Sequence, residues 1–412
     1  MKDRERSEKE GSSSGPAPEP DGEVAGEGAP EQEQVGAPTW RRHAVDLAVV
    51  FVVSRVALTA VGLVSRAITP GPVLRPRPLG VGPTFSGFPF LDVWGEWDTG
   101  WYLTIAEFGY KPGALLGPFA NYGFFPLYPL LARWLGWVVG SPFVGGLIVS
   151  NAALIVACVF LYRLVSLDDD VSTARRAVTY VFAAPVGFVF SAMLTESLYL
   201  ALVIMCFYYA RTERWWTVGA LGFLLALSRG PGVFAAVPLL WLYLEQRRFS
   251  PRRLRPDLLA LALLPAGVGV WMWFNERLTG DALAFTHIQV TAWGNTLRNP
   301  FSHLWQSLWT EDVFHRFAAW YVLGVLVFFI AFLRKFGVAY ALFVLVSVVL
   351  PLAYGGPFAG TLRYTAVVFP LYVVAARVTA GRPGLHQGIV IAGAVLQGFL
   401  MSEWANNSGL VI

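Results

Sequence analysis

Long apolar segments recur along this 412-residue chain, and they restrict its possible folds more than any motif does. The first covers residues 44–64, which matches the roughly 20 residues that a helix needs to cross a bilayer core of ~30 Å. Apolar residues make up 55% of the sequence and charged residues only 14%, a balance typical of integral membrane proteins. Because hydrocarbon offers no partners to an open backbone, the segments predict an all-α, polytopic membrane protein.

Charge asymmetry between the connecting segments predicts the topology. Arginine and lysine gather in alternate connections, most densely at residues 247–255, and such connections normally face the cytoplasm. The alternation stays regular only if residues 122–140, which contain Pro126, Pro129 and Arg133, lie in the interface without crossing. The N-terminus is then cytoplasmic and eleven spans are predicted, at residues 44–64, 142–163, 177–193, 194–210, 215–229, 231–246, 257–276, 317–333, 338–354, 363–379 and 384–402.

Two pairs of these spans are short for two full crossings. Residues 177–210 are interrupted at Thr195-Glu196, and residues 215–246 are interrupted at residues 229–232, which read RGPG. We expect the chain to turn there at half depth and line a polar cavity, because irregular backbone is tolerated at membrane depth where protein surrounds it. Each pair could instead be one long kinked helix, which would lower the count from eleven spans to nine.

The domain organisation follows from charge and length. Residues 1–40 contain ten acidic and four basic residues and are rich in Gly, Pro and Ser, so we expect a disordered acidic tail in the cytoplasm. Residues 41–412 should form a single transmembrane domain in the cell membrane, with a first outer loop at residues 66–141 and a second at 277–316. The second loop is a polar segment of about forty residues, longer than an ordinary connection.

Two charged features of this domain are expected to be structural. Arg55 interrupts the first span, and an arginine at that depth needs a carboxylate or phosphate partner, most simply a salt bridge within the bundle. The acidic run at residues 168–170 precedes a predicted helix beside Arg175 and Arg176. Because acids favour a helix N-terminus, we expect that run to cap the helix.

The stretch from residue 92 to residue 130 is too polar to cross a bilayer and too aromatic for a solvated linker. It places Asp92, Glu96, Asp98 and Glu107 among several Trp and Tyr residues, and these aromatics prefer the headgroup level. Asp98 would then lie at the water–lipid boundary, where a lipid-linked substrate presents its head. An interfacial belt with carboxylates facing water explains the same charge pattern equally well.

The motif WDTGWYLTIAEFGY at residues 97–110, followed by FFPLYP at 124–129, resembles the signature of the PIG-V family. That family contains the mannosyltransferase that adds the second mannose of GPI anchors, together with bacterial relatives. It belongs to the GT-C superfamily, whose members use polyprenyl-phosphate sugars. The resemblance continues at residues 195–198, 228–230 and 363–364. Family members often carry Glu shortly before FFP, whereas this chain has Asn121 there, so a second acidic ligand in that loop stays open.

Sugar transfer from a lipid phosphate needs a base for the acceptor hydroxyl and fixed positive charge for the leaving phosphate. Asp98, the acid of the WD motif, is the predicted general base. Arg363 or Arg229 is expected to hold the donor phosphate through the forked guanidinium donors. Glu196 would either orient an acceptor hydroxyl or hold one of those arginines in an ion pair. Further candidates are Lys111 for the donor phosphate, and Trp97, Trp101, Tyr102, Glu107 and His287 for the acceptor or sugar.

The resemblance and this set of charges predict a membrane glycosyltransferase with its active site on the outer face. It would move mannose from a polyprenyl-phosphate donor to a glycolipid, glycan or protein acceptor, with inversion. We expect no cofactor, no metal and no nucleic-acid partner, because no phosphate-loop motif and no His or Cys pair with metal-site spacing is present in the sequence. A lipid-linked sugar flippase and a non-catalytic glycolipid-binding subunit are the alternatives.

Overall fold

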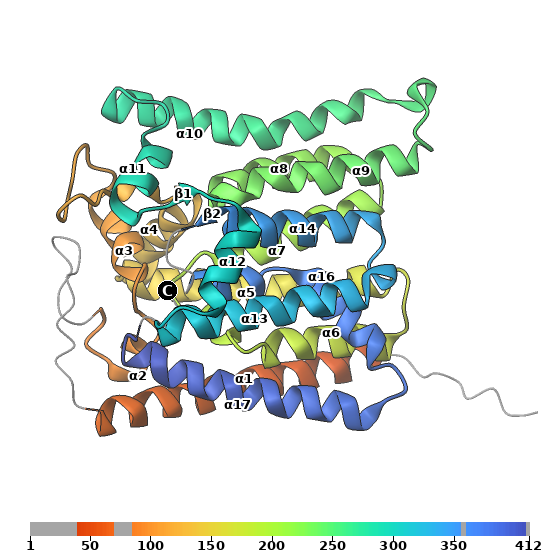
Figure 1. The fold of residues 1–412 in the computed structure, drawn as a ribbon, viewed down its shortest axis with the longest axis horizontal. Helices are drawn as coiled ribbons and strands as arrows, with labels where there is room; N and C mark the ends of the chain where they lie inside the picture. The colour runs from red at the N-terminus through yellow and green to blue at the C-terminus, as the bar shows by residue number, and fades with distance from the viewer. Residues whose placement is uncertain (1–38, 70–84, 356–359, 409–412) are drawn as a thin grey trace, which may run out of the picture. The chain divides into compact units, whose positions relative to one another are not determined.

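The computed structural model describes residues 39–69, 85–355 and 360–408, so the predicted acidic tail lies almost entirely outside the described part. Helices dominate that part, and its two strands, β1 (Thr296–Leu297) and β2 (Tyr354–Gly355), form a short antiparallel pair. Residues His43–Ile412 form one contact unit. The longer α-helices of this unit run roughly alongside one another in Figure 1. The fold is therefore all-α, as the apolar segments predict.

Five helical segments of the described residues are long and apolar enough to cross a membrane, which supports the prediction of a membrane protein. They lie at Val45–Ile68, Pro142–Val165, Pro256–Thr279, Val313–Ala331 and Pro383–Ala405. The α-helices are α1 (Thr39–Ile68), α2 (Pro89–Asp92), α3 (Thr99–Phe108), α4 (Leu127–Val139), α5 (Pro142–Val165), α6 (Val171–Ala183), α7 (Glu196–Arg211), α8 (Trp215–Ser228), α9 (Ala236–Gln246), α10 (Leu263–Thr279), α11 (Ala284–Trp293), α12 (Pro300–Leu308), α13 (Val313–Ala331), α14 (Val338–Ala353), α15 (Thr361–Ala366), α16 (Phe369–Val378) and α17 (Pro383–Ala405).

The predicted interruptions fall where helices end. Helix α6 ends at Ala183, a 3₁₀ turn covers Gly187–Phe190, and α7 begins at Glu196, so this break is wider than the Thr195-Glu196 dipeptide. Helix α8 ends at Ser228, directly before the predicted RGPG break. A 3₁₀ turn (Gly230–Ala235) then leads into α9. A Cβ at Gly232 would lie 2.3 Å from the carbonyl oxygen of Leu225, so this close turn requires glycine.

A third break divides the predicted span at residues 363–379, and the expectation of one continuous helix is wrong there. Helix α15 ends at Ala366 and α16 starts at Phe369. Pro370 lies in the first turn of α16. A proline inside a helix clashes with the carbonyl of the residue four positions earlier, and it has no N–H to donate. An undisturbed helix therefore cannot continue through Pro370.

The expected polar loop at residues 277–316 is largely helical. Gly280 and Gly294 end α10 and α11 in the left-handed conformation, and the side chains of Asn299 and Asp312 cap α12 and α13. Helix α4 has 13 residues, or ~20 Å, so it is too short to cross a bilayer alone. Its expected place in the interface stays a prediction.

The two structural expectations for charged residues have different outcomes. The Asp170 carboxylate accepts a hydrogen bond from the Thr173 amide and caps α6, as predicted. Arg55 instead donates to the Gly187 carbonyl at 3.4 Å, and no ion pair to a carboxylate is present among the described residues. The expected salt bridge is therefore absent from the described part, and Arg55 contacts a carbonyl in the broken backbone after α6 instead.

Candidate active site at the start of helix α7

Four charged side chains meet at the breaks in the bundle. Arg363 Nη2 lies 2.6 Å from Asp98 Oδ2, and Arg229 Nη1 lies 3.1 Å from Glu196 Oε1. The same Glu196 oxygen is 3.8 Å from Arg363 Nε. We call these four residues the charge network. It joins residues up to 265 positions apart in the sequence, and all four were candidates from the sequence.

Each member of the charge network occupies a helix end or a break. Asp98 precedes α3 without capping it through its side chain, so the carboxylate is available to Arg363. Glu196 is the first residue of α7, Arg229 is extended between α8 and the following 3₁₀ turn, and Arg363 lies on the six-residue helix α15. The interrupted helices thus bring charge into the bundle, where surrounding protein makes such a backbone tolerable.

The network is deeply buried, apart from one carboxylate. The side chains of Glu196, Arg363 and Arg229 are 2%, 7% and 12% exposed, whereas that of Asp98 is 24% exposed. Within the described residues, Glu196 Oε2 and Arg363 Nε have no hydrogen-bond partner. Two carboxylates and two guanidiniums balance in charge, and buried polar atoms left unsatisfied in this way call for an explanation.

Aromatic rings border the network. The Arg229 guanidinium lies over the Tyr364 ring, 4.7 Å from its centroid, a cation–π arrangement. Tyr102 meets Phe124 edge to face with centroids 5.3 Å apart. Trp101 stacks on the same Phe124 ring, with the two ring centroids 5.7 Å apart. Trp97, directly before Asp98, has a φ of 52°, which is uncommon for a bulky residue and fixes the chain direction into α3.

Other sequence candidates lie elsewhere. Lys111 and Glu107 are exposed, and the described structure shows neither of them in an ion pair with the charge network. His287 Nδ1 lies 2.6 Å from Asp281 Oδ2. That hydrogen bond lowers the pKa of the exposed Asp281 carboxyl. Asn121, in the segment before FFP, is buried and hydrogen-bonds to backbone groups of Gly109 and Lys111.

Sequence reasoning missed two parts of this region. Tyr364 was noted only as part of a motif, although its ring faces Arg229. Glu96 forms an ion pair with Arg66 at the end of α1, which fastens the segment before Asp98 to the first helix. An acid directly before the WD motif and an arginine at the end of the first apolar span were the available signals.

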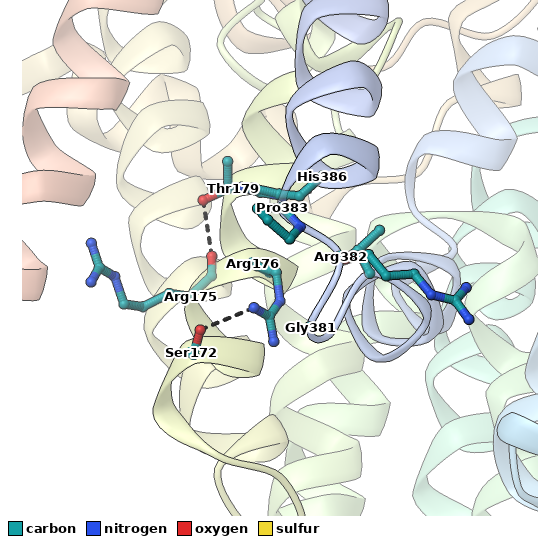
Figure 2. Close-up of a pocket in the computed structure, with 9 residues that line it drawn as sticks. Ser172, Arg175, Arg176, Thr179, Gly381, Arg382, Pro383 and His386 are labelled. Atoms are coloured by element: carbon teal, nitrogen blue, oxygen red, sulfur yellow. Dashed lines mark hydrogen bonds between the residues drawn. The ribbon is translucent and has the colours of Figure 1, made fainter.

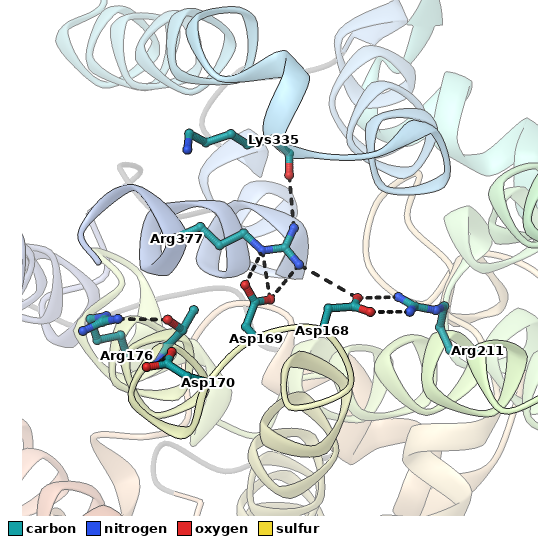
Figure 3. Close-up of polar contacts among 8 residues, drawn as sticks. Asp168, Asp169, Asp170, Arg176, Arg211, Lys335 and Arg377 are labelled. Atoms are coloured by element: carbon teal, nitrogen blue, oxygen red, sulfur yellow. Dashed lines mark hydrogen bonds and ion pairs between the residues drawn. The ribbon is translucent and has the colours of Figure 1, made fainter. Parts of the chain in front are cut away.

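A second charged cluster lies at the opposite end of α7, around the loop between α5 and α6 (Figure 3). Arg211, the last residue of α7, forms two hydrogen bonds with the Asp168 carboxylate, which lower the pKa of that carboxyl. Asp169 pairs with Arg377 at 2.7 Å. Because α7 has 16 residues, it separates this cluster from Glu196 by ~20–24 Å. Besides the Asp170 cap on α6, the acidic run therefore forms ion pairs with Arg211 and Arg377.

Comparisons with known proteins find distant likeness among solved structures alone. No family model matches the chain, so the PIG-V resemblance stays a prediction. No curated protein matches it either. Among solved structures, the crystal structure of an Archaeoglobus fulgidus oligosaccharyltransferase in complex with Zn and sulfate is similar, with a TM-score of 0.40 and 15% identity. The likeness covers 87% of this chain and 53% of that one, so the chain spans about half the length of that enzyme. A similarity this distant says nothing about activity.

Proposed function

We propose that this protein is a membrane glycosyltransferase of the GT-C type that moves a mannosyl residue from a polyprenyl-phosphate donor to an acceptor hydroxyl. The charge network supports the proposal, above all the Asp98–Arg363 pair at 2.6 Å. It places a partly exposed carboxylate beside a buried guanidinium, which are the two groups that the reaction requires. The resemblance of residues 97–110 to the PIG-V family supports the choice of mannose and of a lipid phosphate.

The proposed reaction is a single displacement at the anomeric carbon. The acceptor oxygen forms a bond to that carbon on one face while the bond to the phosphate oxygen breaks on the other, which inverts the configuration. The bonding pair leaves with the polyprenyl phosphate. Asp98 takes the proton of the acceptor hydroxyl, a contribution of ~10²–10⁴ in rate. No acid is needed, because the leaving phosphate is already a stable anion.

Arg363 and Arg229 are the proposed phosphate ligands. Arginine suits a phosphate through two parallel N–H donors, and Arg363 Nε has no hydrogen-bond partner within the described residues. Glu196 lies between both guanidiniums and is proposed to hold them in position. Fixed positive charge there stabilises the negative charge that grows on the leaving phosphate. We propose that no metal takes part, since the arginines supply this charge.

The remaining candidates are assigned to the substrate side on the proposed outer face. Trp97, Trp101 and Tyr102 follow or flank Asp98 in the chain and offer rings against which a sugar could pack. Lys111, Glu107 and His287 lie outside the charge network and are proposed only as contacts of a larger acceptor. A glycolipid, a glycan chain or a protein would serve as the acceptor.

A transfer assay tests the proposal. Membranes containing the protein receive polyprenyl-phosphate-[¹⁴C]mannose, and label in glycolipid, glycan and protein fractions is counted with wild type and with Asp98→Asn. We expect wild-type transfer that the variant loses. Label that crosses the bilayer still attached to its polyprenyl phosphate, without transfer, would favour a flippase. Donor binding with neither transport nor transfer would favour a glycolipid-binding subunit.

A further inference from the structure

A basic pocket lies far from the charge network, at the end of the unit where α6 and α17 begin (Figure 2). Its volume is about 300 Å³, within the range of small-ligand sites. Helix α6 supplies one side, and the turn between α16 and α17 supplies the other. The lining residues are Ser172, Arg175, Arg176, Thr179, Thr379, Gly381, Arg382, Pro383 and His386.

The lining carries three arginines and only part of their charge is balanced. Arg175 pairs with Asp46 at 2.8 Å. Arg176 donates to the hydroxyls of Ser172 and Thr173, which are neutral, and its guanidinium lies beside the turn at Gly381 in Figure 2. The Arg382 side chain has no hydrogen bond or ion pair within the described residues. The pocket therefore offers positive charge and a hydroxyl group. A ligand could bind the Arg382 side chain without breaking any contact among the described residues.

The surroundings of the pocket favour a lipid as the source of the anion. Helix α17, which lines the pocket, exposes the apolar side chains of Leu385 and Ile389. Helix α1, which reaches the lining through the Asp46–Arg175 pair, exposes Val45 and Val49. A lipid could place its charged head in the basic pocket and its acyl chains against the exposed apolar side chains. Basic pockets between transmembrane helices on the cytoplasmic side suit anionic lipid head groups, and the positive-inside rule places this end of the bundle in the cytoplasm.

We propose that this pocket binds the phosphodiester head of an anionic phospholipid from the cytoplasmic leaflet. Arg176 and Arg382 donate to the phosphate oxygens, and the hydroxyl of Ser172 is within the same pocket to complete the shell. Because the site lies at the opposite end of the bundle from Glu196, its occupant is distinct from the proposed sugar donor. This inference does not depend on the proposed function.

The test measures lipid affinity of the full chain in dodecyl maltoside. Thermal unfolding is followed while dioleoylphosphatidylglycerol or dioleoylphosphatidylcholine is added in mixed micelles. We expect saturable stabilisation by phosphatidylglycerol and little by phosphatidylcholine. A basic residue near an anionic lipid contributes about five-fold in affinity. Arg382→Gln should therefore weaken the apparent affinity about five-fold, and Arg176→Gln/Arg382→Gln roughly 30-fold.

The matched control removes two exposed arginines of the loop after α9, Arg252→Gln/Arg253→Gln, and should leave the affinity within about two-fold. Equal weakening by the control would overturn the proposal, since the effect would then be general surface charge. So would unchanged affinity in Arg382→Gln, which loses no described contact and should fold. Inorganic phosphate that stabilises the protein equally well and competes with the lipid would identify a soluble phosphate as the ligand and overturn the lipid assignment.

Discussion

Replacing Asp98 by Asn tests the proposed mechanism most directly, because the change removes the proton acceptor and keeps the shape. Loss of a general base costs ~10²–10⁴ in rate, which is at least ~2.7 kcal/mol in the activation free energy. The amide oxygen of Asn can still accept a hydrogen bond from Arg363, so the variant should fold and bind donor. We expect transfer at saturating donor to fall by ~10²-fold or more.

The stability cost of this substitution can be bounded from the same contact. Removing one partner of a fully buried ion pair destabilises a protein by ~3–5 kcal/mol, but Asp98 is 24% exposed and Arg363 remains 3.8 Å from Glu196. We therefore expect less than ~3 kcal/mol, measured as a fall of a few degrees in the unfolding temperature. That loss should not by itself abolish the fold.

The matched control is Asp168→Asn at the other end of α7. It weakens an aspartate–arginine pair of the same 2.6 Å length, so it reproduces the loss of a short ion pair without touching the charge network. Both variants are purified in detergent, and transfer of labelled mannose is measured together with donor binding and thermal unfolding. The control should keep transfer within a few-fold. A folded Asp98→Asn protein with near-normal transfer would refute the general-base assignment.

Four further predictions concern the same site and its orientation. Arg363→Lys keeps the charge but loses the forked geometry, so donor affinity and turnover should both fall by ~10-fold or more; unchanged kinetics would move the phosphate role to Arg229. Glu196→Gln leaves two buried guanidiniums without a carboxylate between them, so the unfolding temperature should drop more than for Asp98→Asn, and an equal or smaller drop would contradict its positioning role. Cysteines at Ser302 and Arg252, on a background without the two native cysteines, should react with an impermeant thiol reagent from opposite sides of the membrane; reaction from the same side would disprove the predicted topology. Transfer should persist after extensive dialysis against EDTA, and a loss restored by a divalent metal would show that the arginines are not sufficient.

The sequence predicts the members of the charge network better than it predicts their partners. Asp98 and Arg363 stand out because each interrupts or borders an apolar segment, where charge is costly and needs a reason. Their contact joins positions 265 residues apart and depends on how α3 and α15 pack, which no local pattern encodes. For the same reason the sequence left the choice between Arg363 and Arg229 open.

The errors in the predicted elements have local causes. Pro370 is present in the sequence, but the residues around it are apolar. Hydropathy averaged over this stretch therefore predicts one span where the structure has α15 and α16. The helices inside residues 277–316 also had signals, because Asn299 and Asp312 are favourable caps. Their short apolar faces fall below the length of a span, and hydropathy alone therefore reads them as a loop. The partner of Arg55 was predicted wrongly for a different reason, since the carbonyl that it contacts lies in the 3₁₀ turn after α6, which an unbroken span would not contain.

The pairing of the charge network links donor binding to the availability of the Asp98 carboxylate under the proposed function. Its two carboxylates and two guanidiniums are balanced, so a lipid phosphate can bind only by taking guanidinium donors that now face Asp98 or Glu196. Of the two carboxylates, Asp98 is the more exposed, so water can solvate it at the lower cost when Arg363 turns to the phosphate. The carboxylate released in this way is the one proposed to take the acceptor proton. Without donor, Arg363 would hold that carboxylate in its ion pair and so keep it from an acceptor hydroxyl. The same contact would therefore keep the base inactive until the sugar to be transferred is in place.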